Sequence, residues 1–242
     1  MGNENARQRL IVALDVPNAP AARKIVAAVG NSAPTYKVGM QLFTAEGPAF
    51  VRELVGSGHR VFLDLKYHDI PNTVAAAVRS AADLGVHMLT IHASGGGKML
   101  RAAVETAREG GPDMKILAVT VLTSMKDEEL GQIGVSGDAR GQVLRLAALA
   151  LEAGCQGIVG SPQETSELRR QLGNDFLIVT PGVRPAGAAH GDQARVATPA
   201  EAIAAGATHI VVGRPITGAE HPAAAAKAIL EQIAASGVAT SK

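Results

Sequence analysis

A compact group of charged residues follows an apolar run near residue 60. Val61-Phe62-Leu63 leads directly into Asp64-Leu65-Lys66-Tyr67-His68-Asp69. Because side chains alternate between the two faces of a strand, we expect Asp64 and Lys66 to share one face. A lysine held between carboxylates keeps its proton and can donate that proton in a dry pocket. The segment therefore predicts proton donation at the end of a strand.

Composition limits the classes of partner. The chain has 242 residues, of which 47% are hydrophobic and 19% are charged, as is typical of a globular protein. A net charge of +1 and 2% aromatic residues provide neither the basic surface nor the stacking platforms of a nucleic-acid-binding protein. No apolar stretch has the length of a membrane span, and the first ten residues lack a signal-peptide core. With Cys155 as its single cysteine, the chain is expected in the cytoplasm, without a nucleic-acid or membrane partner.

Short apolar runs alternate with longer alanine-rich helical patterns along the chain. The predicted strands are Leu10–Leu14, Thr35–Val38, Val61–Leu65, His87–Ile91, Lys115–Val121, Gly157–Val159, Leu177–Thr180 and His209–Val212. The predicted helices are Ala19–Val29, Gly47–Ser57, Asn72–Leu84, Lys98–Arg108, Ala139–Ala153, Pro162–Leu172, Pro199–Ala205 and Pro222–Ala234. Ser161 and Thr198 precede prolines and are predicted to cap helices.

This alternation predicts a closed (β/α)₈ TIM barrel, with residues 1–242 forming a single domain. The alternative is an open doubly wound sheet. It is disfavoured because the turn after the first strand, Asp15-Val16-Pro17-Asn18, lacks the G-x-G-x-x-G pattern of dinucleotide-binding folds.

Chemically capable residues gather at the predicted carboxyl ends of the strands, where barrels of this type hold their active sites. They are Asp15, Lys37, Asp64, Lys66, Asp69, His92, Thr123, Ser124, Arg184, Gly213 and Arg214. Each has an ordinary structural explanation alone: Asp15 or Thr123 as a helix cap, Lys37 as a strand-end lysine that reaches water, His92 as a hydrogen-bonded core histidine. Two lysines and three aspartates at one rim, however, would be costly without a ligand.

A second group predicts phosphate binding. Gly213-Arg214 follows the last strand, where such barrels often bind phosphate through loop amides and a short helix. Arg184 and Gln193 lie on the long loop after the seventh strand and are expected to fold over the same anion. The alternative is a flexible surface loop.

Other signals do not support a cofactor. Ser94-Gly95-Gly96-Gly97-Lys98 lacks the flanking residues of a Walker A motif, and a tight turn between strand and helix explains it better. The seven histidines show no metal-ligand spacing, and no G-x-S-x-G motif is present. We therefore expect neither a metal nor an organic cofactor.

The strand-end segments together resemble the orotidine 5'-phosphate decarboxylase family. The resemblance extends from Leu10 to about Pro215. It is carried by Asp15, Lys37, Phe62 to Thr73, Ile91-His92-Ala93, Leu122-Thr123-Ser124, Thr180 to Pro185, Asp192-Gln193-Ala194-Arg195 and Val212-Gly213-Arg214-Pro215. The D-x-K-x-x-D element alone is shared with related phosphosugar barrels, but its combination with Lys37 and Pro-Gly-Val-Arg is much more specific.

The resemblance implies cofactor-free decarboxylation of orotidine monophosphate to UMP, the last step of pyrimidine synthesis. It implies that Lys66 donates the proton, that Asp64 faces the substrate carboxylate, and that Lys37 and Asp15 hold ribose hydroxyls. The remaining substrate contacts implied are Thr123 at the pyrimidine, Arg184, Gln193, Gly213 and Arg214 at the phosphate, and Pro181 and His92. It further implies a homodimer in which Asp69, Ile70 and Thr73 complete the partner's site.

Two other functions stay open at this point. A sister barrel enzyme acting on a keto-sugar phosphate would hold Mg²⁺ and would favour an acid where this chain has Lys37. A non-catalytic sensor of phosphate ligands would have no need of a charged lysine between two acids.

Overall fold

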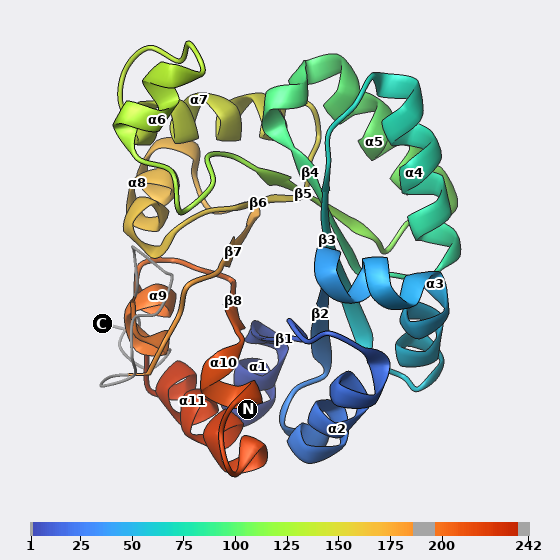
Figure 1. Cartoon of the computed structure of the whole chain (residues 1–242). Helices are drawn as coiled ribbons and strands as arrows, with labels where there is room; N and C mark the ends of the chain where they lie inside the picture. Colours follow the sequence, from blue (N-terminus) through green and yellow to red (C-terminus); the bar gives the residue numbers. More distant parts are fainter. Residues whose placement is uncertain (1, 186–196, 237–242) are drawn as a thin grey trace.

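Eight parallel strands form a closed barrel, which confirms the predicted fold class. The computed structural model describes residues 2–185 and 197–236. In Figure 1 the strands form a central ring with helices around it. The strands, hydrogen-bonded in sequence order with the last beside the first, are β1 (Leu10–Ala13), β2 (Thr35–Gly39), β3 (Arg60–Tyr67), β4 (Met88–His92), β5 (Lys115–Val119), β6 (Gly157–Val159), β7 (Leu177–Thr180) and β8 (His209–Val212).

All eight predicted helices are present, with small shifts at most ends. They are α2 (Ala19–Val29), α3 (Met40–Gly56), α4 (Pro71–Asp83), α5 (Gly96–Gly110), α7 (Ala139–Glu152), α8 (Pro162–Leu172), α9 (Pro199–Ala204) and α11 (Pro222–Ser236). The largest difference is in α3, which begins at Met40 and is interrupted by a non-helical Gly47 with φ of 64°. The predicted helix corresponds to the part after this kink.

Several short helices were not predicted. They are α1 (Gly2–Arg9), α6 (Asp127–Gln132), α10 (Arg214–Thr217) and the 3₁₀ turns η1 (Gly30–Ser32) and η2 (Ala93–Gly95). Their sequences are too short or too polar to produce an apolar stripe with helical periodicity. Of the two predicted caps, Thr198 accepts a hydrogen bond from Glu201 N at 3.2 Å, while the Ser161 hydroxyl donates to Glu164 at 2.6 Å.

The barrel has two separate apolar layers, because alternate strand residues face opposite ways. Residues facing outward pack against the helices. The barrel interior is filled by Ile11, Ala13, Phe62, Met88, Leu117, Val179 and Val211. This inner layer divides the barrel interior into two ends. Residues two positions after a layer residue on the same strand face the carboxyl end of the barrel. Residues two positions before it face the amino end.

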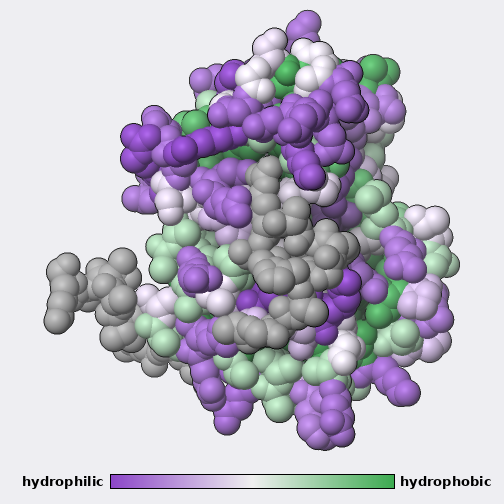
Figure 2. All heavy atoms as spheres, turned by 60° about the vertical axis from the view of Figure 1, so that its left-hand side comes forward, coloured by the Kyte–Doolittle hydropathy of each residue, from purple (hydrophilic) through white to green (hydrophobic). Residues whose placement is uncertain are grey.

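Hydrophilic residues dominate the face in Figure 2, with apolar residues in smaller groups between them. Within residues 2–185 and 197–236, no helix has the length and apolar character needed to cross a bilayer. The cytoplasmic location stays a prediction from the sequence.

Candidate active site

A cavity of about 440 Å³ opens at the carboxyl ends of the strands. Its floor is the apolar barrel interior, including Phe62, Val179 and Val211. Its polar and charged lining residues are Asp15, Lys37, Asp64, Lys66, Thr123, Arg184, Arg214 and Thr217. Residues from six different strand ends therefore meet in one pocket.

Four of these side chains form a line of alternating charge, called here the charge chain: Asp15, Lys37, Asp64 and Lys66. Lys37 Nζ donates to Asp15 Oδ1 at 2.7 Å and lies 3.7 Å from Asp64 Oδ2. Lys66 Nζ lies 2.9 Å from both carboxylate oxygens of Asp64. The side chains of Lys37, Asp64 and Lys66 are only 10%, 14% and 24% exposed, so their charges interact with less screening than surface pairs.

The backbone of β3 is irregular where it carries Lys66. The β3–β4 register shifts between Leu63 and Tyr67, and Lys66 has a φ of 53°. Among the described residues, Lys66 is the only non-glycine residue with positive φ. Such a conformation is unfavourable for a lysine and is retained where surrounding contacts fix it. Asp64 and Lys66 lie on the same side of β3, as predicted, but this placement depends on the irregular backbone at Lys66 as well as on regular strand alternation.

Thr90 on β4 is a residue that sequence reasoning missed. Its hydroxyl donates to Asp64 Oδ1 at 3.0 Å and accepts the backbone N–H of Lys66 at 2.9 Å. It is fully buried, and it connects the carboxylate to the strained backbone of Lys66. The only available signal was a polar residue inside the apolar run Met88 to Ile91. This signal is weak, because threonine is common in strands.

Asp15 is not the cap of α2. The cap is Asn18, whose Oδ1 accepts the N–H of Ala21 at 3.0 Å. Asp15 is thereby left to accept from Lys37. Gly39 lies beneath this pair: a Cβ built there would be 3.0 Å from Lys37 Nζ and 3.2 Å from Asp15 Oδ1.

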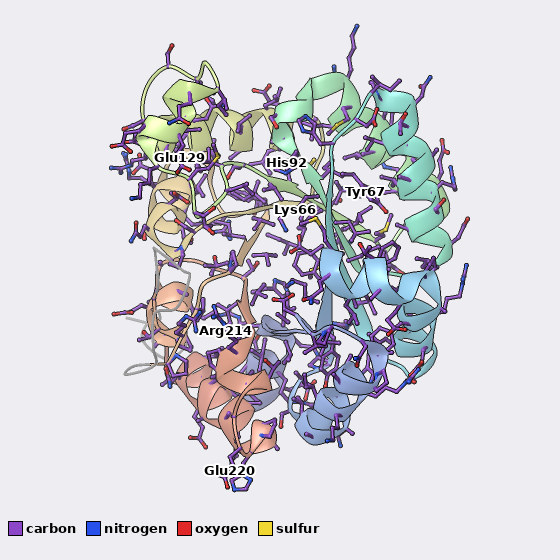
Figure 3. The ribbon with its side chains drawn as sticks, in the orientation of Figure 1. Lys66, Tyr67, His92, Glu129, Arg214 and Glu220 are labelled. Atoms are coloured by element: carbon purple, nitrogen blue, oxygen red, sulfur yellow. The ribbon has the colours of Figure 1, made fainter. Side chains whose placement is uncertain are left out.

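Two arginines also line the cavity. Arg184 follows β7 and Arg214 begins α10, directly after Gly213. Burial lowers the pKa of Arg184, and the positive charge of Arg214 lowers it further. The two guanidinium groups are thus close enough to repel, and an anion between them would be stabilised. Figure 3 shows Lys66 and Arg214 on opposite sides of the barrel opening.

Comparison with known proteins places this geometry in a family. The family model described as "Orotidine 5'-phosphate decarboxylase / HUMPS family" matches residues 8–229. The chain is 55% identical to the orotidine 5'-phosphate decarboxylase of Halorhodospira halophila over 95% of this chain and 97% of the relative. It is 51% identical to that of Moorella thermoacetica over 95% of this chain and 93% of the relative.

The chain belongs to the orotidine 5'-phosphate decarboxylase family. A solved structure of this family, the orotidine 5'-phosphate decarboxylase from Lactobacillus acidophilus, superposes with a TM-score of 0.85 at 40% identity. The superposition covers 93% of this chain and 99% of the other.

Within a single chain, Lys66 contacts only one of the two acids that the sequence placed around it, among the residues that the structure describes. The sequence suggested a lysine held between two acids, whereas Asp64 lies between Lys37 and Lys66. Asp69 does not reach Lys66. It lies in the exposed turn before α4, where its carboxylate accepts its neighbour's N–H, that of Ile70, at 2.6 Å. The turn redirects the chain away from the cavity before the third acid can contribute.

The remaining residues expected from the family divide into three groups. Thr123, Pro181, Arg184, Gly213 and Arg214 line the cavity. Asp69, Ile70 and Thr73 are exposed and do not line it, with Ile70 66% exposed. Gln193 lies outside the described residues.

His92 is not among the residues that line the cavity. It ends β4 and packs against His68, with ring centroids 5.4 Å apart. Burial lowers its pKa, and the positive charges of His68 and Lys66 lower it further. The structure therefore places His92 beside the site as a largely neutral ring, and its contact with substrate stays a prediction.

No group of three or more histidine, cysteine, aspartate or glutamate side chains suited to a metal ion occurs in the described ranges. What the cavity offers is fixed charge: two ammonium groups and two carboxylates on one side, and two guanidinium groups among its other lining residues.

Proposed function

We propose that this chain decarboxylates orotidine 5'-phosphate to UMP, using its own side chains alone. The observation that carries the mechanism is the Lys66–Asp64 pair, which places a partly buried ammonium group in the cavity with both of its carboxylate contacts at 2.9 Å. The two arginines supply a separate place for the phosphate. Membership of the family supports the substrate and the reaction.

The reaction needs stabilisation of negative charge at carbon. The bond between C6 and the carboxylate breaks, its electron pair stays on C6, and CO₂ leaves. The carbanion at C6 has no adjacent group that can accept this pair. The Lys66 ammonium interacts with it electrostatically and then transfers a proton from Nζ to C6, giving UMP. Water returns a proton to the lysine before the next turnover.

Asp64 has two roles in this proposal. It fixes Lys66 Nζ in position, and Thr90 in turn fixes Asp64. It also faces the carboxylate of the substrate, and repulsion between two carboxylates is relieved when CO₂ forms. Lys37 on the other side of Asp64 limits the cost of burying that negative charge.

Arg184 and Arg214 bind the phosphate, which takes no part in bond breaking. Charged hydrogen bonds to a remote group can hold the reacting carbon beside Lys66 and raise the rate as well as the affinity. Since these residues follow β7 and β8, the phosphate occupies the place where barrels of this type commonly bind one.

We further propose a homodimer in which the exposed edge formed by Asp69, Ile70 and Thr73 completes the partner's site. These three side chains are exposed, do not line their own cavity, and follow the strand that carries Lys66. Mixing inactive Lys66→Ala protomers with inactive Asp69→Ala protomers would restore activity, since one site per hybrid dimer has both residues intact. Absence of recovery despite proven subunit exchange would contradict the shared site.

The function is tested by following the ultraviolet absorbance of orotidine 5'-phosphate with purified enzyme, with and without a chelator. The expected result is conversion to UMP at the same rate in both. Binding of the nucleotide without turnover would instead indicate a sensor. Loss of activity with chelator would indicate a metal-dependent relative that acts through an enediolate.

A further inference from the structure

A second group of charged side chains lies at the opposite end of the barrel. Its members lie two positions before residues of the inner apolar layer in the sequence. The residues reached from Ile11, Phe62, Leu117 and Val211 are Arg9, Arg60, Lys115 and His209. Arg60, Lys115 and His209 begin β3, β5 and β8 and share the inward face of their strands with the layer residues. We call these four residues the N-terminal rim.

The members of the N-terminal rim act on one another. Burial, with a smaller contribution from the charges of Arg9 and Arg60, lowers the pKa of His209 to about 4. His87, just before β4, contributes to the same shift, and its own pKa is lowered by burial and by Arg60 and Lys115. Arg60 and Lys115 at the starts of two strands and Arg9 at the end of α1 are therefore close enough for their charges to act on these two histidines.

Little negative charge balances this group. In residues 2–185 and 197–236, Arg9, Arg60 and Lys115 form no ion pair within 4.0 Å. Arg60 Nη1 donates to Gln8 Oε1 at 2.5 Å, a neutral acceptor. Asp113 is the one acid whose charge acts on His87, and its side chain is exposed. Like charges gathered in this way repel and lower stability unless a counter-charge is bound.

We infer that the N-terminal rim binds a multivalent oxyanion of the phosphate class. Three permanent cations supply charge and directed N–H donors, and phosphate offers several acceptor oxygens and two negative charges to match them. Arg60 is exposed and the other three side chains are partly exposed, so a dissolved anion can reach them. Monovalent chloride would match this arrangement less well.

This site is separate from the proposed phosphate contacts of the substrate. Arg184 and Arg214 lie beyond the opposite end of the inner apolar layer. Bound anion would stabilise the folded barrel by linkage and would raise the pKa of His209 and His87, because the nearby negative charge favours their protonated forms.

The test is thermal unfolding of the full chain in inorganic phosphate, compared with sodium chloride at equal ionic strength. Saturating UMP is present throughout, so that the active-site cavity is occupied. At phosphate 100-fold above its dissociation constant, we expect a rise in Tm of about 5 °C. The rise should persist in Arg214→Ala and disappear in Lys115→Gln. In parallel, NMR titration should show the His209 pKa rising when phosphate is added.

Arg60→Gln provides a second variant, and Lys98→Gln, an exposed lysine on α5, is the matched control. Both Lys115→Gln and Arg60→Gln should retain wild-type decarboxylation, which keeps this inference independent of the proposed function. A Tm that depends on ionic strength alone would overturn it. So would a phosphate effect that survives in both rim variants or that is lost in Arg214→Ala.

Discussion

The two ends of the barrel interior differ in whether their charged side chains form ion pairs. At the carboxyl end, the charge chain alternates acid and base, with contacts of 2.7 to 3.7 Å between successive members. At the amino end, the N-terminal rim collects Arg9, Arg60 and Lys115 without an ion pair among the described residues. Strand β3 contributes to both groups, with Arg60 at one end and Asp64 and Lys66 toward the other, and one apolar layer separates them.

This contrast shows what pairing accomplishes. In the charge chain, each ammonium group has a carboxylate neighbour that offsets the cost of its low exposure. In the rim, partial exposure moderates the repulsion between like charges, and burial followed by this repulsion lowers the pKa of both His209 and His87. The carboxyl end pairs its charges within the chain, whereas the amino end leaves its cations to be neutralised by a bound anion.

Removing the central acid should have the largest effect on this contrast. Asp64→Asn leaves two lysines without their common carboxylate, so that the charge chain, like the rim, then contains neighbouring cations without an acid between them. Breaking a buried pair costs about 3–5 kcal/mol, so we expect kcat for decarboxylation to fall by roughly 10³-fold. Asp175→Asn, at an exposed position, is the control. A loss of less than tenfold in Asp64→Asn would show that the alternation is not needed.

The arginine side of the cavity should matter next. Arg214→Ala removes a charged contact to phosphate worth about 1.5–3 kcal/mol, so kcat/KM for orotidine 5'-phosphate should fall by roughly 10²-fold. Orotidine without its phosphate should be turned over equally by both enzymes. Arg108→Ala, an exposed arginine on α5, serves as the control. An equal loss on both substrates would contradict phosphate recognition by Arg214.

The rim predicts a specific sensitivity to acid. The folded-state pKa of His209, about 4, is below the ordinary value of 6.5, so between these values the unfolded chain binds more protons. Stability should therefore be unaffected by His209 above pH 6.5 and should fall as pH drops from 6.5 toward 4. From pH 7.5 to pH 5 the contribution is about 2 kcal/mol, measurable by urea unfolding in phosphate-free buffer.

His209→Gln should lose this part of the pH dependence. His221→Gln, at an exposed histidine, should keep it. Identical pH dependence in wild type and His209→Gln would mean that His209 is not held neutral by its surroundings.

Gly39 should give the smallest effect. Its φ of −94° suits alanine, but the added Cβ would stand 3.0 Å from Lys37 Nζ and must displace the Lys37–Asp15 pair. We expect Gly39→Ala to lower kcat/KM about fivefold with little change in Tm, since fitting one extra methyl group against a packed side chain costs about 1 kcal/mol. Gly56→Ala, where a Cβ meets nothing within 4 Å, is the control. Unchanged activity in Gly39→Ala would show that Lys37 does not need its position.

Regular periodicity explains why most of the barrel could be predicted. The strands Gly157–Val159, Leu177–Thr180 and His209–Val212 have the predicted bounds, because short apolar runs between helical patterns are unambiguous. Lys37, Asp64 and Lys66 were found because strand ends meet at one rim in this fold.

The site features that could not be predicted depend on contacts between segments that are distant in the sequence. Thr90 contacts Asp64 and Lys66 only because β4 lies beside the irregular end of β3. The positive φ of Lys66 cannot be predicted from a run of strand-forming residues. The contact of Asp15 with Lys37 likewise joins two segments that are distant in the sequence. A single sequence does not provide these distances.

The most direct test of the account is the decarboxylation rate of Lys66→Ala in chelator-treated enzyme, with Lys24→Ala, an exposed lysine on α2, as the control. Loss of both charge stabilisation and proton donation predicts a fall in kcat of roughly 10⁴-fold or more. UMP binding, measured by calorimetry, should persist in the variant, because Arg184 and Arg214 remain. A Lys66→Ala enzyme that retains kcat within tenfold of wild type would contradict the central role of this ammonium group.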